Sequence, residues 1–320
     1  MISVVIANFN RKEYLRNCLK SLQTQTVSPL EIIVVDNASS DGSVQMVENE
    51  FPNINLIRNN ANCYLAAAYN QGITYSRAEF ILCLNNDVIL DRHFIEKIIK
   101  GFNLAEDTGV LTGLILRINN EAIIDSTGQF LSRSRRPLDR GSGQYLKKKF
   151  MVEGYVFGGS GSAVVYRRKM LEQIKIGDEY FDEDFKLFYE DLDLNWRANR
   201  FGWKAYYIPE AVAYHLRGGT IKTEWPYPRF LNKFYFSYLS ADYQKIYIRN
   251  RYLTIIKNDC FKNYLKDFIF IFCFDLSLFF YALLFRPCIL NVFLDILKYS
   301  KSAIKKRKII FENLKGRNDL

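Results

Sequence analysis

The feature that most constrains the fold is the alternation of apolar and amphipathic segments in residues 1–101. Continuous apolar runs predict strands over residues 2–7, 31–35, 54–57 and 80–84. Helical spacing predicts helices over residues 11–23, 43–50 and 65–75, and Asp91 is expected to cap another helix that ends at Gly101. Strands that are apolar throughout are typical of a mostly parallel sheet covered by helices on both faces, so we expect an α/β fold.

Polar side chains follow these strands at the points where they end. Asn8 follows the first strand, Asp36 the second, and Asn85-Asn86-Asp87 the fourth. Ligands of such sheets bind beyond the carboxyl ends of the strands. A carboxylate at position 36 can accept the imide N–H of uracil or thymine. Asp87 can hold Mg²⁺ or Mn²⁺, which takes oxygen ligands and neutralises a diphosphate leaving group. The alternative for the Asn-Asn-Asp cluster is a simple turn.

Two further acidic clusters are candidates for function. Asp41 lies in a Ser-Ser-Asp-Gly-Ser turn, where the alternative is a helix cap. Glu190-Asp191-x-Asp193 opens a predicted helix over residues 190–202, directly after an aromatic run. Sugar transfer to a hydroxyl needs a base, and an aromatic surrounding raises the pKa of a carboxylate, whereas a helix N-terminus lowers it. The alternative is ordinary acidic capping of the helix.

His215 is one of only two histidines and ends a predicted strand before Gly218-Gly219. A neutral imidazole there can join a metal or contact a diphosphate, and the alternative is a packed or surface histidine. His93 is assigned to a helix without function. The glycines of residues 158–162 match no phosphate-binding loop and predict a flexible loop or a close backbone approach.

Beyond residue 101 we expect short strands over residues 110–165, a basic mobile loop over 132–149, and strands over 204–208 and 212–215. Residues 268–285 are strongly apolar, with Asp275 in the middle, and a basic tail follows. We interpret them as a helix lying in the plane of a membrane surface. The alternatives are a homodimer interface and a helical subdomain packed on the core. We therefore predict a catalytic domain over residues 1–222 and a helical, membrane-associated region over 223–320.

The composition indicates the cellular compartment and the kind of partner. The net charge of +10 favours a negatively charged partner such as a diphosphate, an anionic lipid or a nucleic acid. The six cysteines form no C-x-x-C pair, and the first apolar run lacks a signal peptide's basic leader, so we expect a cytoplasmic protein. The basic residues concentrate in a loop and a tail and no nucleic-acid motif is present, so we expect no nucleic-acid partner.

The clusters together, in their order and spacing, resemble the family 2 glycosyltransferases. The resemblance extends over residues 1–222 and includes the segments VVIANFNRKEYLRNCLKSL, VVDNASSDGS and FYEDLDLNWRANRFGWKAYYIPEAVAYHLRGGT. It implies a GT-A fold, Rossmann-like with an added small sheet. It also implies inverting transfer from a nucleoside-diphosphate sugar, with Mg²⁺ or Mn²⁺ as cofactor.

The resemblance also implies roles for single residues. Asp191 is similar to the general base, with Glu190 beside it, and Asp87 and His215 resemble metal or diphosphate contacts. The positions that resemble donor contacts are Asn8, Asp36, Asp41, Asn62 and Asn86. The sequence departs from the family pattern in two places. Tyr64 stands where the family usually has glycine, and Asn85 stands where other branches have the first carboxylate of the metal motif.

The Asn-Asn-Asp form and RNRYLTIIKN at residues 249–258 resemble the bacterial rhamnosyltransferase-like branch. This implies dTDP-rhamnose as donor and a glycan or polyprenyl-diphosphate-linked acceptor at the inner face of the cell membrane, in surface polysaccharide synthesis. The alternative is a catalytically silent membrane scaffold with the same fold, against which the retention of Asp87 and Glu190-Asp191 argues. A processive synthase that exports its polymer is not expected, because it would need several spanning helices and the sequence does not show them.

Overall fold

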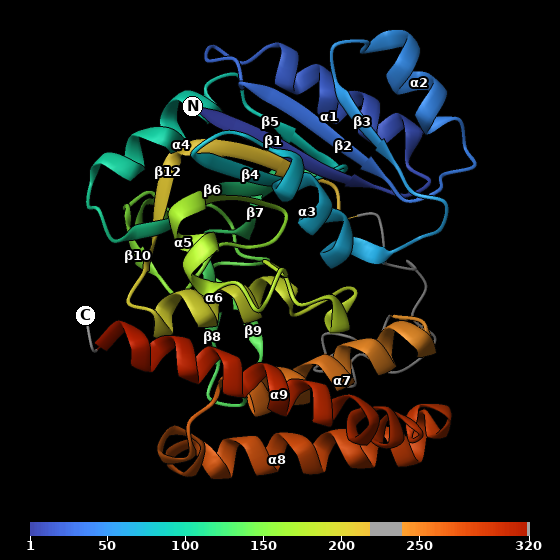
Figure 1. Ribbon diagram of the computed structural model, residues 1–320, viewed down its shortest axis with the longest axis vertical. Helices are drawn as coiled ribbons and strands as arrows, with labels where there is room; N and C mark the ends of the chain where they lie inside the picture. The colour runs from blue at the N-terminus through green and yellow to red at the C-terminus, as the bar shows by residue number, and fades with distance from the viewer. Residues whose placement is uncertain (218–238, 319–320) are drawn as a thin grey trace. The chain divides into compact units, whose positions relative to one another are not determined.

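The structure is a computed structural model that describes residues 1–217 and 239–318 (Figure 1). The chain forms two compact units. The first unit comprises residues 1–130, 138–186 and 190–216, and the second comprises 131–137, 187–189 and the described part of 217–320. The predicted domain boundary after residue 222 lies outside the described residues and stays a prediction. Gly218 and Gly219 also lie outside them.

The first unit begins with the predicted alternation of strands and helices, and each of these elements lies within one residue of its predicted range. The elements are β1 (Ile2–Asn8), α1 (Lys12–Gln23), β2 (Glu31–Asp36), α2 (Ser43–Glu50), β3 (Asn55–Arg58), α3 (Tyr64–Tyr75) and β4 (Phe80–Asn85). After β5 (Val88–Leu90), the helix that Asp91 is predicted to cap is α4, which spans Phe94–Lys100 and therefore begins three residues after Asp91. His93 is the N-cap residue of α4, and its amide donates to the Asp91 carboxylate.

The main sheet has the strand order β10-β12-β6-β11-β4-β1-β2-β3. The strands β4, β1, β2 and β3 are parallel neighbours, so their carboxyl ends meet at one edge, as predicted. β11 (Ala163–Arg167) runs antiparallel between β4 and β6 (Thr108–Arg117). Its first residue, Ala163, pairs with Leu84. The antiparallel strand therefore starts where the parallel strands end.

The two strands predicted over residues 204–208 and 212–215 form one strand, β12 (Lys204–His215), with a bulge after Ile208. At the bulge the Ala211 carbonyl lies so close to Gly113 that a Cβ at Gly113 would be 2.1 Å from its oxygen. A bulge changes the direction of a strand. Beyond it, β12 pairs antiparallel with β5, and His215 faces Val88. This register brings His215 next to Asp87.

The basic segment over residues 132–149 contains regular structure, so the prediction of a loop throughout is wrong. β9 (Pro137–Asp139) pairs with β8 (Gln129–Leu131), and a 3-10 turn spans Lys148–Phe150. The remaining elements of the first unit are 3-10 turns at Gly101–Asn103 and Glu183–Phe185, β7 (Asn120–Ser126), β10 (Gly154–Val156), α5 (Arg168–Ile174) and α6 (Glu190–Arg200).

The second unit is helical and consists of α7 (Ala241–Asn258), α8 (Phe261–Phe285), a 3-10 turn at Pro287–Ile289, and α9 (Val292–Asn318). α7 packs against α9, and α8 contacts the 3-10 turn. The predicted apolar segment is part of the longer helix α8. The loop residue Arg135 is 4% exposed, and its guanidinium forms ion pairs with Asp259 and Asp267.

The side chains of β1 point alternately to the two faces of the sheet and contribute to the core on both. Val4 and Ile6 pack on one face with residues of α1, α2 and α4. Val5 points to the other face, which α3 covers (Figure 1). Gly72 of α3 lies against the Val5 side chain. A Cβ at Gly72 would lie 2.2 Å from the Val5 Cγ1 atom, so only glycine allows this close approach.

We predict that Gly72→Ala lowers the free energy of unfolding by about 1–3 kcal/mol, because it overpacks the contact with Val5. Urea unfolding followed by circular dichroism measures this. The exposed neighbour Gln71→Ala, on the same helix, is the matched control and should change stability by less than about 0.5 kcal/mol. Adding Val5→Ala to Gly72→Ala should recover part of the loss beyond additivity, and strictly additive effects would contradict the proposed contact.

Candidate functional site

A chain of hydrogen bonds joins the carboxyl ends of β2, β1 and β4. The Asn8 amide donates to the Asp36 carboxylate over 2.8 Å, and the Asn86 amide donates to the Asn8 Oδ1 atom over 2.7 Å. The second carboxylate oxygen of Asp36 accepts the Ser39 backbone N–H over 2.8 Å. Asp36 and Asn8 are almost fully buried. Three of the predicted donor-binding residues therefore lie in one connected cluster.

A second cluster is centred on His215. The His215 Nε2 atom lies 3.2 Å from the Asp87 carboxylate, and the Nδ1 atom lies 2.8 Å from Asp125. Burial disfavours the charged imidazole, but the hydrogen bonds with Asp125 and Asp87 outweigh it and raise the pKa of His215 to about 9. For Asp87, burial is outweighed by the hydrogen bond from His215, which lowers the pKa of the carboxyl. Asp125 fixes the ring so that Nε2 faces Asp87.

The third cluster surrounds Asp191 at the start of α6. One of its carboxylate oxygens, Oδ2, accepts the Gly161 backbone N–H and the Gln129 side-chain amide, each over 3.0 Å. The other oxygen, Oδ1, accepts the Leu192 backbone N–H over 2.7 Å. Burial raises the pKa of Asp191 above its ordinary value, and these hydrogen bonds oppose the rise. The carboxylate is half-buried and has a fixed orientation.

The other two acidic residues of α6 have different surroundings. Glu190 is 6% exposed, and its Oε2 atom has no hydrogen-bond partner in the described part of the chain. Burial, together with the charge of Asp191, raises the pKa of Glu190 well above its usual range. Asp193 is fully buried and forms an ion pair with Arg197 over 3.0 Å. Asp191 is therefore the best placed of the three to accept a proton, and Asp193 stabilises the fold.

The glycine-containing segment over residues 158–162 connects the third cluster with the end of β4. The Gly161 amide reaches Asp191, and the Ser162 carbonyl accepts the Asn85 backbone N–H over 2.9 Å. A Cβ at Gly158 would lie 2.2 Å from the Asn195 side chain, and one at Gly161 would lie 3.2 Å from Asp191. The expected close backbone approach is therefore present, and its partner is α6. The segment therefore contacts both the start of α6 and, at Asn85, the end of β4, two residues before Asp87.

Two predicted donor contacts make local hydrogen bonds. Asp41 is exposed and accepts the backbone N–H groups of Lys12 and Ser43, at the starts of α1 and α2. Asn62 accepts the Tyr64 backbone N–H at the start of α3. Tyr64 has a φ of 66°, in the left-handed region that favours glycine. The departure from glycine at this position therefore places a tyrosine in a conformation that side chains disfavour.

The sequence analysis missed Asp125, Gln129 and Asn195. Asn195 donates to the Gln129 Oε1 atom and the Gly159 carbonyl, and Gln129 in turn donates to Asp191. All three residues are at most 3% exposed. The available signal was an acidic or amide side chain inside an otherwise apolar strand or at a buried helix position, where a polar group needs a partner.

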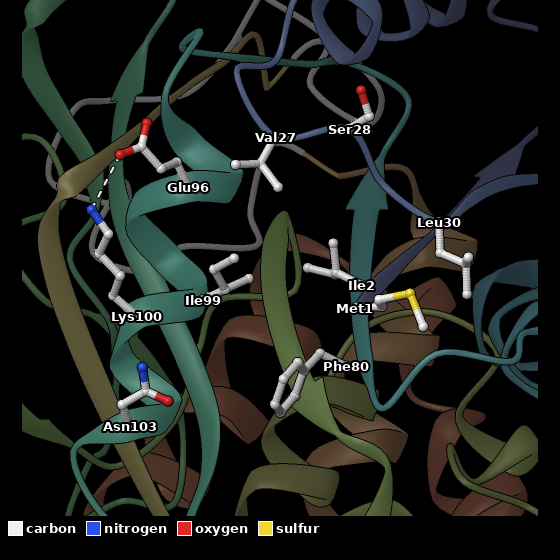
Figure 2. Close-up of a pocket in the computed structure, with 10 residues that line it drawn as sticks. All are labelled: Met1, Ile2, Val27, Ser28, Leu30, Phe80, Glu96, Ile99, Lys100 and Asn103. Atoms are coloured by element: carbon white, nitrogen blue, oxygen red, sulfur yellow. Dashed lines mark hydrogen bonds and ion pairs between the residues drawn. The ribbon is translucent and has the colours of Figure 1, made fainter.

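A cavity of about 400 Å³ lies at the opposite edge of the sheet (Figure 2). Its lining includes Ile2 and Phe80, the first residues of β1 and β4, together with Val27, Leu30 and Ile99. Glu96 is bonded to Lys100 at its margin, as Figure 2 shows. None of the predicted site residues lines this cavity. It is therefore separate from the polar clusters at the carboxyl ends of the strands.

Comparison with known proteins identifies relatives. The chain is 29% identical over 220 residues to the putative glycosyltransferase EpsH of Bacillus subtilis, covering 68% of this chain and 60% of that protein. It is 24% identical over 237 residues to the N-acetylglucosaminyl-diphospho-decaprenol L-rhamnosyltransferase of Mycobacterium tuberculosis, covering 67% of this chain and 76% of that protein. The match therefore spans less than two thirds of the Bacillus protein.

Solved structures share the fold at low sequence identity. The mannosyltransferase PcManGT from Pyrobaculum calidifontis, solved with GDP-Man and Mn²⁺, aligns with a TM-score of 0.54 and 14% identity, covering 99% of this chain and 86% of that one. S. aureus TarS aligns with a TM-score of 0.59 and 15% identity, covering 98% of this chain and 54% of that one. The predicted GT-A fold is confirmed by these neighbours.

The family model for "Glycosyl transferase family 2" matches residues 3–175, which is more than half of the 320 residues. The match contains the Asn8–Asp36–Asn86 cluster, Asp87, Asp125 and the Gly158–Gly161 segment. The chain belongs to glycosyl transferase family 2.

Proposed function

We propose that the protein is an inverting glycosyltransferase that moves a sugar from a nucleoside-diphosphate donor to an acceptor hydroxyl, with Asp191 as the general base. The observation that carries the proposal is the Asp191 carboxylate, held by Gly161 and Gln129 at the edge where β4 ends. In an inverting reaction, one carboxylate takes the acceptor proton as the hydroxyl attacks the sugar. Glu190 is almost fully buried, and burial together with the charge of Asp191 raises its pKa, whereas Asp191 is only half-buried, so Asp191 is the better placed of the two to receive the proton.

The donor half of the site consists, in this proposal, of the Asn8–Asp36–Asn86 cluster with Asp41 and Asn62 beside it. Each Asp36 oxygen accepts one protein hydrogen bond. A carboxylate oxygen has a second lone pair, so Asp36 retains the capacity to accept the imide N–H of uracil or thymine. We propose dTDP-rhamnose as donor and a glycan or polyprenyl-diphosphate-linked acceptor in surface polysaccharide synthesis. The similarity to the mycobacterial L-rhamnosyltransferase supports this choice.

A divalent cation, Mn²⁺ or Mg²⁺, fits the Asp87–His215 pair. The donor set is a carboxylate and an imidazole, and a second carboxylate, Asp125, fixes the imidazole, as is usual for metal-binding histidines. Among the described residues, no group of three or more His, Cys, Asp or Glu side chains fits a metal. In this proposal, Asp87 and His215 therefore bind the cation only together with the oxygens of the donor diphosphate. When bound, such an ion neutralises the charge of the leaving diphosphate.

We further propose that α8 lies in the plane of the inner face of the cell membrane. α8 is the one described helix whose length and composition would suffice to cross a membrane. Its acidic residues are engaged within the second unit, since Asp267 pairs with Arg135 and Asp275 pairs with Arg251. The opposite side carries exposed apolar residues, among them Ile269, Phe272, Leu276, Phe279, Phe280 and Leu283. Protein along one side and apolar residues along the other favour an interfacial helix over a spanning one.

Basic side chains accompany this apolar surface. The exposed lysines of α8 and α9 include Lys262, Lys266, Lys298, Lys301, Lys305 and Lys308. Such residues attract the anionic headgroups of a bilayer, each contributing about 1 kcal/mol near the surface. The exposed lysines and the apolar face of α8 therefore both support a membrane surface as the partner.

We predict that Asp191→Asn lowers kcat by about 10²–10⁴-fold, because the variant cannot take the acceptor proton. A panel of UDP-, dTDP- and GDP-sugars, screened by thermal stabilisation and then by turnover, identifies the donor and measures the loss. Donor binding should be retained. Asp193→Asn is the matched control, and it should lower thermal stability while leaving turnover per folded molecule close to that of the wild type. Turnover of Asp191→Asn within twofold of the wild type would contradict the assignment.

We predict that Asp125→Asn weakens Mn²⁺ binding by about 10–100-fold, because His215 loses the carboxylate that orients it. Titration of Mn²⁺ in the presence of dTDP or UDP, followed by the melting temperature, measures this without turnover. Glu96→Gln, which removes an exposed carboxylate bonded to Lys100, is the control and should leave the Mn²⁺ titration unchanged. Equal Mn²⁺ affinities for Asp125→Asn and the wild type would exclude the Asp87–His215 site.

We predict that the triple variant Phe272→Ser, Phe279→Ser and Phe280→Ser binds vesicles containing phosphatidylglycerol at least tenfold more weakly than the wild type. Co-sedimentation with the vesicles measures the loss, and raising the salt concentration should weaken binding of both proteins. The control replaces Leu30, Leu104 and Leu138, which are exposed to a similar extent in the first unit, with serine. If the α8 variant binds normally but changes a dimer into a monomer, α8 is a subunit interface.

A further inference from the structure

Asp191 accepts a hydrogen bond from a side chain that is fixed in turn by a second side chain. The Gln129 Nε2 atom donates to the Asp191 Oδ2 atom over 3.0 Å, and the Gln129 Oε1 atom accepts the Asn195 Nδ2 group over 3.1 Å. The same Nδ2 group donates to the Gly159 carbonyl over 2.9 Å. Asn195 and Gln129 therefore form an amide relay that ends on the candidate base, and all of these residues belong to the first unit.

The bond from Asn195 decides which way the Gln129 amide faces. A carboxamide has an oxygen that accepts and a nitrogen that donates, so turning it around would replace a hydrogen bond to a carboxylate with a repulsion. Because the Asn195 N–H group needs an acceptor, the Gln129 oxygen faces Asn195 and the Gln129 nitrogen faces Asp191. Asn195 and Gln129 are 0% and 3% exposed, so bulk water does not compete for these bonds.

The backbone at Gln129, the first residue of β8, is fixed as well. Its N–H donates to the Gly158 carbonyl over 2.7 Å. The preceding residue, Gly128, has a φ of 107°, and a Cβ there would lie 2.8 Å from the Val156 Cγ1 atom, so the turn into β8 requires glycine. The Gln129 side chain therefore reaches Asp191 from a fixed point of the main chain.

The Asn195 side chain leaves one buried atom unpaired. Its Oδ1 atom has no hydrogen-bond partner in the described part of the chain. An unpaired buried acceptor destabilises a fold, so the bonds donated by Nδ2 have to offset it. Both bonds go to groups that themselves hold Asp191, namely Gln129 and the glycine segment whose Gly161 amide binds the carboxylate.

Two titratable side chains interact electrostatically with Asp191. Burial, together with the charge of Asp191, raises the pKa of its neighbour Glu190 well above the usual range. Tyr166 of β11 is fully buried, and burial, followed by nearby groups that include Asp191, raises the pKa of its phenol. Neither side chain supplies a positive charge. Burial raises the pKa of Asp191, and the hydrogen bonds from Gly161, Leu192 and Gln129 oppose the rise.

We infer that Gln129 and Asn195 are positioning residues, which fix the orientation of the Asp191 carboxylate and stabilise its ionised form. The inference rests on the proposed role of Asp191 as the base. Gln129 acts directly, because a hydrogen bond donated to a carboxylate favours the charged state. Asn195 acts through Gln129, whose amide it orients. The relay thus assigns a part in the reaction to two buried amides that contact neither donor nor acceptor in the proposed mechanism.

The test compares variants of the 320-residue chain. Gln129→Met keeps the length of the side chain and removes its donor. Gln129→Glu keeps the shape and places a second carboxyl group beside Asp191. Asn195→Leu removes the amide that orients Gln129. Asn199→Ala is the matched control, because the Asn199 amide also donates from α6 to nearby backbone, at the Phe157 carbonyl, without contacting the side chains of the relay.

The first measurement is the titration of Asp191 itself, followed by NMR of the carboxyl carbons in protein labelled at aspartate, with Asp191→Asn identifying the signal. We expect Gln129→Met to move the titration to higher pH, because the ionised carboxylate loses a donor. Gln129→Glu should move it further, because a like charge then opposes ionisation. Asn199→Ala should leave it unchanged. Melting temperatures establish which variants are folded, and Gln129→Glu decides the result if Gln129→Met does not fold.

The second measurement is the pH dependence of kcat with the donor found in the nucleotide-sugar panel. Because protonated Asp191 cannot accept the proton, kcat falls with decreasing pH, and a raised pKa moves this acid limb to higher pH. In Gln129→Met, we expect kcat on the acid limb, relative to the alkaline plateau, to be at least about threefold lower than in the wild type, with the donor KM within about twofold. A purely structural role would lower kcat equally at every pH.

The double variant Gln129→Met, Asn195→Leu tests the order of the relay. Asn195→Leu alone should move the titration of Asp191 to higher pH, because the Gln129 amide is no longer held in one orientation. Once Gln129 has lost its donor, the same change should add little, so the two shifts should be less than additive. Strictly additive shifts would overturn the role of Asn195.

An unchanged titration of Asp191 in folded Gln129→Met and Gln129→Glu overturns the inference whatever their activity. An equal shift in Asn199→Ala overturns it too, because the effect would then be a general change in α6. A shifted titration with an unshifted acid limb of kcat overturns the link to the reaction. If the wild type turns over no nucleotide sugar, or Asp191→Asn keeps full activity, it is the proposed function that fails. The NMR titration still decides in that case whether the relay acts on Asp191.

Discussion

The hydrogen bond from the Gly161 amide to the Asp191 carboxylate is the contact on which the candidate site depends. It exists because the segment over residues 158–162 carries glycines where it meets α6. A Cβ at Gly158 would collide with Asn195, and one at Gly161 would press on Asp191 itself. The same segment accepts the backbone N–H of Asn85 at the end of β4. One short stretch of backbone therefore ties the acidic start of α6 to the edge where the parallel strands end.

The buried charged side chains at this edge of the sheet differ in the partners that surround them. His215 lies between Asp87 and Asp125, and the two carboxylates raise the pKa of the imidazole to about 9. Glu190 and Asp191 are adjacent but differ in surroundings, because Asp191 accepts three hydrogen bonds whereas Glu190 Oε2 accepts none within the described residues. The two adjacent carboxyl groups therefore have unequal surroundings, which is a cause of different pKa values.

Two helices of the second unit differ in which side chains they bury. α7 carries a row of fully buried polar side chains, whereas α8 exposes phenylalanine and leucine along much of its length. Arg135 and Arg251 link the two, since they bind acidic residues of α8 and, for Arg251, the Ser134 carbonyl of the β8–β9 connection. The two acidic residues of α8 are therefore ion-paired within the second unit, and the exposed side of the helix is left apolar.

The sequence by itself determined the first half of the fold and the edge at which the polar residues collect. β1 to β4 and α1 to α3 follow from local periodicity, which depends on residues three or four positions apart. The ends of parallel strands meet at one edge whatever lies further along the chain. The sequence also indicated Asp36, Asn86, Asp87, Asp191 and His215, because each follows a strand or opens a helix.

Only the tertiary structure decided how those residues are held. Asp125 and Gln129 were missed because their partners, His215 and Asp191, lie 90 and 62 positions away in the chain. β12 was divided in two because its bulge depends on Gly113 of a neighbouring strand, and the predicted basic loop contains β9 because that strand pairs with β8. Contacts between segments that are distant in the chain leave no periodic pattern in the sequence, so only the folded structure shows them.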